Sequence, residues 1–293
     1  MSRSGFVALA GRPNVGKSTL VNAIVGEKVA IVSDRPQTTR RAIRGVHQSG
    51  ESQIVLVDLP GVQRPRDALT SRMARRVQQE LEGSDAALLM INAEQGVGPG
   101  DRFTAAMIGE AAVPVTIAVN KLDRVSDAVL MAVLDEAAGL NAGAEVFPIS
   151  ARRGAGVPEL VAHLAALMPK GPFMFAAGSA SDQPRELLLA ELIREAVIRR
   201  TFQEVPHAVE VVIEDVEVPR PGLTRVRALI WVETNSQKGI LIGAQGRMIK
   251  AIGVAARREL ERVVGDQVHL DLSVRVRRDW RADDALLDRL GIT

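Results

Sequence analysis

The sequence predicts two domains. The first is an α/β domain with a doubly wound, mostly parallel sheet and helices on both faces, and the second is a smaller α+β domain. Three observations predict this fold class. Strand-like and helix-like segments alternate over residues 5–168, a stretch rich in Pro, Gly, Ser and Ala follows at 169–184, and the order of the elements changes after it. We therefore expect a first domain over 1–168, a linker over 169–184 and a second domain over 185–293.

The elements of the first domain follow in a regular order. Apolar runs such as Ile54-Val55-Leu56-Val57 are typical of buried strands. The segments 41–47 and 53–58 are joined by the short turn Ser49-Gly50-Glu51, which predicts a hairpin and one antiparallel edge. The expected strands are 6–10, 41–47, 53–58, 86–92, 114–119 and 145–149, and the expected helices are 17–25, 67–82, 101–111, 126–138 and 157–168.

The composition excludes several classes of protein. Hydrophobic residues make up 46% of the 293, but aromatic residues only 3%, so the core must be aliphatic. Cysteine is absent, which excludes disulfides and Cys-based metal or redox sites. We expect no membrane span, because no run of about 20 apolar residues occurs, and no signal peptide, because Ser2-Arg3-Ser4 leads straight into a strand. The formal net charge of +2 is too small to indicate a partner.

A phosphate-binding motif lies between the first strand and the first helix. Residues 11–18 match G-x-x-x-x-G-K-[ST] in the strand–loop–helix context that the motif needs. The glycines let backbone N–H groups close on phosphate oxygens, and the helix N-terminus adds partial positive charge. Lys17 is expected to reach the β- and γ-phosphates, and the Ser18 hydroxyl to bind Mg²⁺. The predicted nucleotide contacts here are Gly11, Arg12, Pro13, Asn14, Val15, Gly16, Lys17, Ser18 and Thr19.

Polar residues after three other strands complete the predicted site. Asp58-Leu59-Pro60-Gly61 ends a hydrophobic strand, where Asp58 would hold Mg²⁺ through water and the Gly61 N–H would sense the γ-phosphate. Asn120-Lys121-Leu122-Asp123 and Ser150-Ala151 also follow strands. Ligands bind at this end of the strands in open α/β sheets, which supports one shared site.

Asp123 selects the base. Its carboxylate can accept hydrogen bonds from the N1–H and the 2-amino group of guanine, and adenine lacks both donors. Lys121 is expected to lie along the base plane, Asn120 to tie its loop to the phosphate loop, and a backbone N–H of Ser150-Ala151 to meet the guanine O6. The sequence therefore predicts GTP rather than ATP, and the first 168 residues resemble the translation-factor-like branch of the P-loop GTPases.

In that superfamily, the segment from Asp34 to Arg41 is switch I, which brings a threonine hydroxyl to Mg²⁺ when the γ-phosphate is present. Thr39 is the first choice for this ligand and Thr38 the second. The alternative is that Thr38 and Thr39 are ordinary loop residues and that neither binds Mg²⁺.

The residue that orients water in Ras-like GTPases is a glutamine after the Asp-x-x-Gly glycine, and here that position is Val62. Valine cannot orient or activate water, so we expect slow hydrolysis that needs help. Asn14 could hold a K⁺ ion, as in the related MnmE group, or an arginine could act in cis from Arg35, Arg40 or Arg41. We favour K⁺; a factor that uses GTP only as a ligand is the alternative.

The second domain has the element order of a type II KH domain. The GxxG motif is Gly243-Ala244-Gln245-Gly246, and a turn without side chains lets a sugar-phosphate backbone approach closely. The alternatives are a plain helix hairpin with a glycine turn and a protein-binding domain. The expected elements are a helix at 185–202, strands at 208–218 and 224–234, a helical region at 237–264, a strand at 267–277 and a helix near 282–290. The predicted RNA contacts are Lys238, Ile242, Gly243, Ala244, Gln245, Gly246, Arg247 and Lys250.

A GTPase domain joined to one C-terminal type II KH domain is similar to the Era family. The resemblance spans residues 5–291 and includes Arg35-Pro36-Gln37-Thr38-Thr39-Arg40, Val268-His269-Leu270 and Trp280. It implies a cytoplasmic GTPase that uses Mg²⁺ and GTP or GDP and binds the 3′ end of small-subunit ribosomal RNA. It also implies a role in assembly of the small ribosomal subunit and peripheral association with the inner face of the cell membrane; we expect a monomer.

Overall fold

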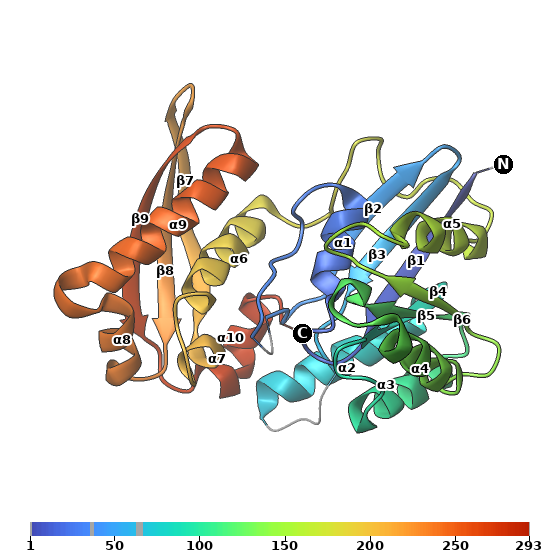
Figure 1. The fold of residues 1–293 in the computed structure, drawn as a ribbon. Helices are drawn as coiled ribbons and strands as arrows, with labels where there is room; N and C mark the ends of the chain where they lie inside the picture. Colours follow the sequence, from blue (N-terminus) through green and yellow to red (C-terminus); the bar gives the residue numbers. More distant parts are fainter. Residues whose placement is uncertain (1, 36–37, 63–66, 293) are drawn as a thin grey trace.

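A six-stranded sheet with one antiparallel edge forms the centre of the first domain (Figure 1). The structure is a computed structural model that describes residues 2–35, 38–62 and 67–292; Pro36 and Gln37 of the expected switch lie outside the described residues. The strand order is β2-β3-β1-β4-β5-β6, and only β2 runs antiparallel, against β3. The strands are β1 (Arg3–Ala10), β2 (Ile43–Ser49), β3 (Ser52–Asp58), β4 (Ala86–Asn92), β5 (Val115–Asn120) and β6 (Glu145–Ile149).

Helices cover both faces of this sheet, which confirms the predicted doubly wound fold. Alternate residues of a strand point to opposite faces, so Val7 and Leu9 of β1 pack with one group of helices, and Ala8 and Ala10 with the other. Helices α1 (Lys17–Val25) and α5 (Val157–Leu167) cover the first face, and α2 (Ala68–Glu82), α3 (Pro99–Glu110) and α4 (Asp127–Ala138) cover the second.

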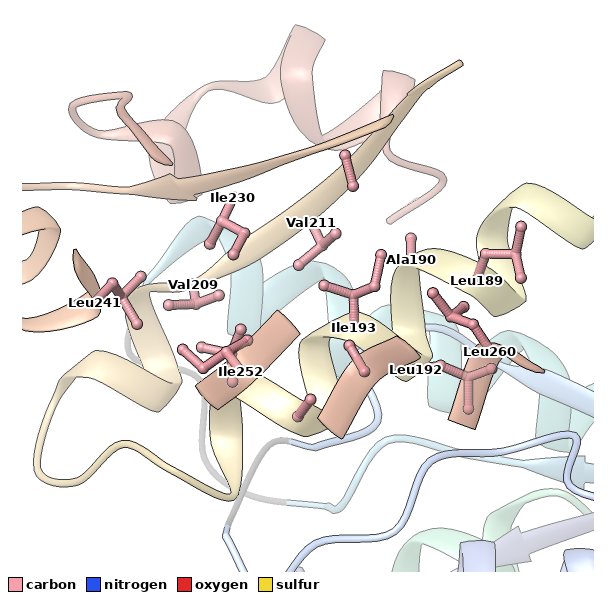
Figure 2. Packing of buried hydrophobic residues seen from close by; sticks show 14 of the residues in the cluster. Leu189, Ala190, Leu192, Ile193, Val209, Val211, Ile230, Leu241, Ile252 and Leu260 are labelled. Atoms are coloured by element: carbon pink, nitrogen blue, oxygen red, sulfur yellow. The ribbon is translucent and has the colours of Figure 1, made fainter. Parts of the chain in front are cut away.

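The second domain is a three-stranded mixed sheet with helices packed on one face. Strand β8 pairs antiparallel with β7 and parallel with β9. Figure 2 shows the core, in which residues of α6, such as Leu192 and Ile193, meet Ile252 and Leu260 of α9. The elements are α6 (Arg185–Ile198), α7 (Val205–Ala208), β7 (Glu210–Arg220), β8 (Leu223–Val232), α8 (Asn235–Ile242), α9 (Arg247–Val264), β9 (Gln267–Val276) and α10 (Asp284–Arg289).

One expectation for this half of the chain needs correction. The helix expected at 185–202 ends at Ile198, and the separate short helix α7 follows it. The segment 169–184, the expected linker, is hydrogen-bonded along the first domain. The Gln53 side chain holds the backbone of Met174 and Phe175 at 2.8–3.0 Å, and the Val46 N–H donates to the Ala180 carbonyl at 2.9 Å.

No single helix of the described residues is both long enough and apolar enough to cross a membrane. One pair of helices, Asn235–Ile242 and Ala244–Val264, has sufficient length and apolar composition only when taken together, and it is bent by 41°.

A buried ion cluster joins the two domains. Arg40 and Arg41 come from the segment before β2, and Glu191, Arg194 and Glu210 come from the second domain; all five are at most 7% exposed. Arg40 pairs with Glu210 at 2.7 Å, and Arg41 bridges Glu191 at 2.9 Å and Glu210 at 3.1 Å. Burial alone would raise the pKa of Glu210, but Arg41 and Arg40 outweigh it and hold that pKa at about 2.

Apolar contacts extend the same interface. Ile31, which precedes the switch I segment, is buried in the hydrophobic core of the second domain. Leu69 and Met73 of α2 pack with Trp280 and Leu287 of the C-terminal segment. The two domains therefore meet over switch I and over α2, as Figure 1 shows for α2 and α10.

We predict that Glu210→Ala lowers the free energy of unfolding by about 3–5 kcal/mol, because it leaves buried Arg40 without a carboxylate and Arg41 with Glu191 alone. Urea denaturation followed by the fluorescence of Trp231 and Trp280, both in the second domain, measures this loss. The matched control is Glu217→Ala, which removes the ion pair between Arg225 and Glu217. The Glu217 side chain is 47% exposed, so this change should lower the free energy of unfolding by less than about 0.5 kcal/mol.

The wild type and Glu210→Ala also test how the stabilisation by Glu210 depends on pH. The folded-state pKa of Glu210 is about 2, below its ordinary 4.5, so its stabilisation is complete above pH 4.5 and is lost as the pH falls toward 2. The difference in stability between the wild type and Glu210→Ala should therefore shrink below pH 4.5. A difference that stays constant down to pH 3 would contradict an ionised Glu210 as its source.

Candidate functional site

The phosphate loop wraps around a buried lysine. The Lys17 ammonium donates to the carbonyls of Gly11 and Arg12, both at 3.1 Å. Burial lowers the pKa of Lys17 to about 8, and Asp58 only partly offsets this effect. Gly16 has φ 105°, and a Cβ there would lie 2.2 Å from the Asn120 amide nitrogen, so the loop requires glycine at this position. An anion in contact with Lys17 would raise this pKa again and favour the charged ammonium.

Three oxygen-bearing side chains meet beside the loop. The Ser18 hydroxyl donates to Asp58 Oδ2 at 2.6 Å, and Thr39 Oγ1 lies 3.2 Å from the Ser18 hydroxyl and 3.4 Å from the same carboxylate oxygen. Asp58 is fully buried, and its Oδ1 has no hydrogen-bond partner among the described residues. Burial raises the pKa of Asp58 to about 6.

These residues fit a hard divalent cation. Mg²⁺ is bound through oxygen ligands, and a buried carboxylate with an unpaired oxygen is stabilised by a positive ion at that position. The two switch threonines differ in their placement. Thr39 lies in the oxygen cluster, whereas the Thr38 hydroxyl donates to the Arg35 carbonyl at 2.7 Å.

A small cavity of about 50 Å³ marks the phosphate region. Its lining brings together the phosphate loop, switch I and Gly61, which lies against Pro13. Other predicted contacts lie outside it: the Arg12 guanidinium turns toward α3 and pairs with Asp101 at 2.8 Å. Leu59 is buried in the hydrophobic core. The cavity is lined by Pro13, Asn14, Gly16, Lys17, Ser18, Thr19, Ile31, Val32, Ser33, Arg35, Thr38, Thr39 and Gly61.

Asn120 joins the base-recognition loops to the phosphate loop. Its amide nitrogen donates to the Val15 carbonyl at 2.8 Å, and its Oδ1 accepts from the backbone N–H groups of Lys121 at 2.8 Å and Ala151 at 2.9 Å. Lys121 has a left-handed backbone with φ 71°. This arrangement is the tie between loops that the sequence predicted for Asn120.

Asp123 is oriented by the side chain of Ser150, a role that the sequence did not predict for this serine. The Ser150 hydroxyl donates to Asp123 Oδ1 at 2.6 Å, and this hydrogen bond is the main reason that the pKa of Asp123 is lowered. The carboxylate is therefore ionised and able to accept from a base. The backbone N–H of Ser150 donates to the Ala155 carbonyl at 2.9 Å, and that of Ala151 donates to Asn120 Oδ1 at 2.9 Å. The contact of one of these N–H groups with the guanine O6 stays a prediction.

The structure places two of the three proposed cis arginines away from the phosphate loop. Arg40 and Arg41 are held at both guanidinium groups by the buried ion cluster between the domains. Arg35 lines the cavity at the phosphate loop, and its guanidinium lies 5.0 Å from the centre of the Phe202 ring. Val62 packs against the core of the first domain. Asn14 remains at the loop, where its side-chain amide donates to the Asp34 carbonyl of switch I at 2.7 Å.

The GxxG motif forms an exposed turn between α8 and α9. Gly243 has φ 68°, and a Cβ there would lie 2.7 Å from the Met248 Cβ, so the tight turn needs glycine. Ala244 and Gln245 are exposed, as are Arg247 and Lys250 at the start of α9. Ile242 instead packs against the core of the domain.

A groove of about 360 Å³ continues from this turn between α9 and β9. The residues that line this groove were not predicted from the sequence. Gly253, a glycine in the middle of a helix, is the signal that could have indicated that another element lies close to α9 there. The groove is lined by Ile249, Lys250, Gly253, Val254, Arg257, Val268, His269, Leu270 and Leu272.

Comparison with known proteins assigns both halves of the chain. Residues 6–121 match the family model described as a 50S ribosome-binding GTPase, and residues 204–281 match that of the KH domain. The chain is 48% identical to GTPase Era of Mycobacterium leprae over 297 residues, covering 99% of this chain and 98% of that protein. It is 41% identical to GTPase Era of Lactobacillus helveticus over 289 residues, covering 99% and 96%.

Two solved structures share the fold over the whole chain. One is Era in complex with MgGDPNP and nucleotides 1506–1542 of 16S ribosomal RNA, with a TM-score of 0.96, 35% identity and 100% of both chains covered. The other is an Aquifex aeolicus Era variant bound to GDP·AlF4⁻, with a TM-score of 0.95, 35% identity and 99% of both chains covered. The phosphate loop, the guanine-recognition residues and the KH-type second domain thus lie in one chain that belongs to the Era family of GTPases.

Proposed function

We propose that this GTPase is a switch protein that binds the 3′ end of small-subunit ribosomal RNA through its second domain and assists assembly of the small ribosomal subunit. The observation that carries the proposal is the presence, in one molecule, of a guanine-specific nucleotide site and an exposed GxxG groove. Its structural relative Era binds MgGDPNP and nucleotides of 16S ribosomal RNA together, and the likeness covers the whole chain.

Each residue of the nucleotide site has a role in this proposal. Lys17 contacts the β- and γ-phosphates, the Gly61 N–H contacts the γ-phosphate, and Asp123 accepts from guanine. Ser18, Thr39 and Asp58 hold Mg²⁺, Asp58 through water. The cation neutralises phosphate charge when it is bound.

We propose that K⁺ supplies the remaining positive charge in hydrolysis. Val62 offers no polar group, and Arg40 and Arg41 are held in the domain interface. Asn14 is an exposed residue of the phosphate loop, and its side chain already contacts the backbone of switch I. A carbonyl oxygen at this position is suited to a monovalent cation beside the phosphates, where charge develops in the transition state.

The RNA would lie along α9. Its backbone would pass the GxxG turn, where Arg247 and Lys250 attract phosphates, and its bases would occupy the groove between α9 and β9. GTP would order switch I through Thr39 and switch II through Gly61 and so change how the second domain is held. RNA affinity measured with a GTP analogue, with GDP and without nucleotide tests this coupling, and equal affinities in all three would rule it out.

We also propose a cytoplasmic monomer that associates peripherally with the inner face of the cell membrane. This part of the proposal is supported by the family resemblance alone. Fractionation of cell extracts with and without a salt wash tests it.

We predict that Asp123→Asn weakens GTP binding by about 10²–10⁴-fold, because two charge-assisted hydrogen bonds to guanine are lost at about 1.5–3 kcal/mol each. The variant should gain affinity for xanthosine triphosphate, whose C2 carbonyl accepts from the new amide. Competition titration with a fluorescent nucleotide measures both. Asp135→Asn, at an exposed position of α4, is the control and should bind as the wild type does; equal GTP affinity in both variants would exclude Asp123 from base recognition.

We predict hydrolysis at least about tenfold faster in KCl than in NaCl at equal ionic strength, because one electrostatic contact in the transition state commonly contributes more than 1.4 kcal/mol. Asn14→Ala should abolish the difference between the salts, whereas Asn141→Ala, away from the loop, should keep it. Phosphate release under single turnover measures the rates. Identical wild-type rates in the two salts would remove the K⁺ proposal.

We predict that the double change Ala244→Asp and Gln245→Asp weakens binding of a 16S 3′-end oligonucleotide by about 30-fold or more. Two carboxylates beside the phosphates each cost about 1 kcal/mol or more. Fluorescence anisotropy measures the affinity, and GTP hydrolysis without RNA should not change. The control, Ala244→Ser with Gln245→Asn, keeps the turn uncharged and should bind normally; unchanged affinity in the charged variant would place the RNA elsewhere.

A further inference from the structure

Helix α6 of the second domain lies beside the segment that leads into switch I and contacts switch I itself at Thr38 and Arg41 (Figure 1). In the leading segment, Lys28 pairs with Glu195 of α6 at 2.6 Å. Glu195 also accepts from the Val32 N–H at 3.1 Å, and Arg199 donates to the Val32 carbonyl at 3.2 Å. The second domain therefore binds the backbone of this segment directly.

Arg194 makes the contact nearest to the nucleotide site. Its Nη2 donates to the backbone carbonyl of Thr38. Glu191, one turn earlier on α6, orients the guanidinium by accepting from Nε at 3.1 Å and from Nη2 at 2.5 Å. The Arg194 side chain is fully buried, which restricts it to this geometry.

The Thr38 carbonyl controls the position of Thr39. The carbonyl of one residue and the N–H and Cα of the next lie in one rigid peptide plane. A guanidinium that holds this carbonyl therefore fixes the plane from which the Thr39 side chain departs. On the other side of Thr39, Arg40 is held by Glu210 and by the carbonyls of Val209 and His207, each at 2.7 Å.

We propose that Arg194 is a positioning residue for the GTPase site. It holds the Thr38 carbonyl so that the Thr39 hydroxyl stays beside Ser18 and Asp58, where it receives Mg²⁺. The RNA-binding domain thus supplies part of the magnesium site without touching the nucleotide. This inference rests on the proposed function, in which Thr39 binds Mg²⁺ in the GTP state.

The test compares Mg²⁺ dependence in the two nucleotide states. Arg194→Lys keeps the charge but loses the planar fork that reaches Glu191 and Thr38 together. Arg194→Met removes the charge and serves as a second variant. Fluorescent GTP analogue and fluorescent GDP are each titrated with Mg²⁺ on the full chain, and hydrogen exchange of the amides at 38–43 is measured with the analogue bound.

We expect both Arg194 variants to raise the Mg²⁺ concentration at half-saturation by about tenfold with the analogue. Hydrogen exchange at 38–43 should be faster. With GDP, the half-saturation should stay within about twofold of the wild type, because the switch threonine reaches the metal only when the γ-phosphate is present. Arg199→Lys is the matched control, since this exposed residue of the same helix contacts Val32 just before switch I and lies away from Thr39, and it should behave as the wild type.

Thr39→Ala and its combination with Arg194→Lys complete the test. If Arg194 acts through Thr39, adding Arg194→Lys to Thr39→Ala changes the Mg²⁺ half-saturation no further. Additive effects, or equal losses with GDP and with the analogue, would overturn the inference. A Thr39→Ala protein that binds Mg²⁺ normally with the analogue would instead show that the proposed role of Thr39 is wrong, so the two failures are distinguishable.

Discussion

The buried ion cluster between the domains is the interaction on which the arrangement of this molecule depends. Arg40, Arg41 and Arg194 carry three positive charges, and Glu191 and Glu210 carry two negative charges, all out of contact with water. Such a cluster is costly unless every charge has a partner. Backbone carbonyls add further acceptors: those of Val209 and His207 accept from Arg40, that of Leu290 from Arg41 and that of Thr38 from Arg194. The domains are thereby held in one relative position.

The cluster places the second domain against both regions that we propose to contact the γ-phosphate, switch I and the Gly61 loop with the helix after it. Switch I lies along α6, with Ile31 buried in the core of the second domain. The helix after switch II, α2, packs on Trp280, and its Arg72 pairs with Asp284 at 2.8 Å. A change at Thr39 or Gly61 on nucleotide hydrolysis would therefore act on the packed contacts between the domains. Packed side chains change between a few discrete arrangements and do not deform continuously.

Most of the fold could be predicted from the sequence, because it depends on local patterns. The strands, the antiparallel hairpin and the position of the phosphate loop follow from apolar runs and turn residues, and the structure has them within a few residues. The residues around Lys17, Asp58 and Asp123 could be predicted because each follows a strand, and strand ends of a parallel sheet converge. The positions of the Arg40 and Arg41 side chains could not be predicted. A pair of arginines in a loop has the same sequence whether the side chains face a phosphate or a carboxylate that is distant along the chain.

The type of each domain and the chemistry of the nucleotide site follow from the amino-acid sequence alone, because hydrophobic period, glycine positions and short motifs act within one segment or its neighbours. The folded chain is needed to see which residues join the domains, that Thr39 rather than Thr38 meets Ser18, and that Ser150 orients Asp123 through its hydroxyl. These choices depend on partners far away along the chain, such as Glu210, 170 residues from Arg40, and Leu290, 249 residues from Arg41. Long-range pairs of this kind are selected by burial and charge balance, which no local pattern contains.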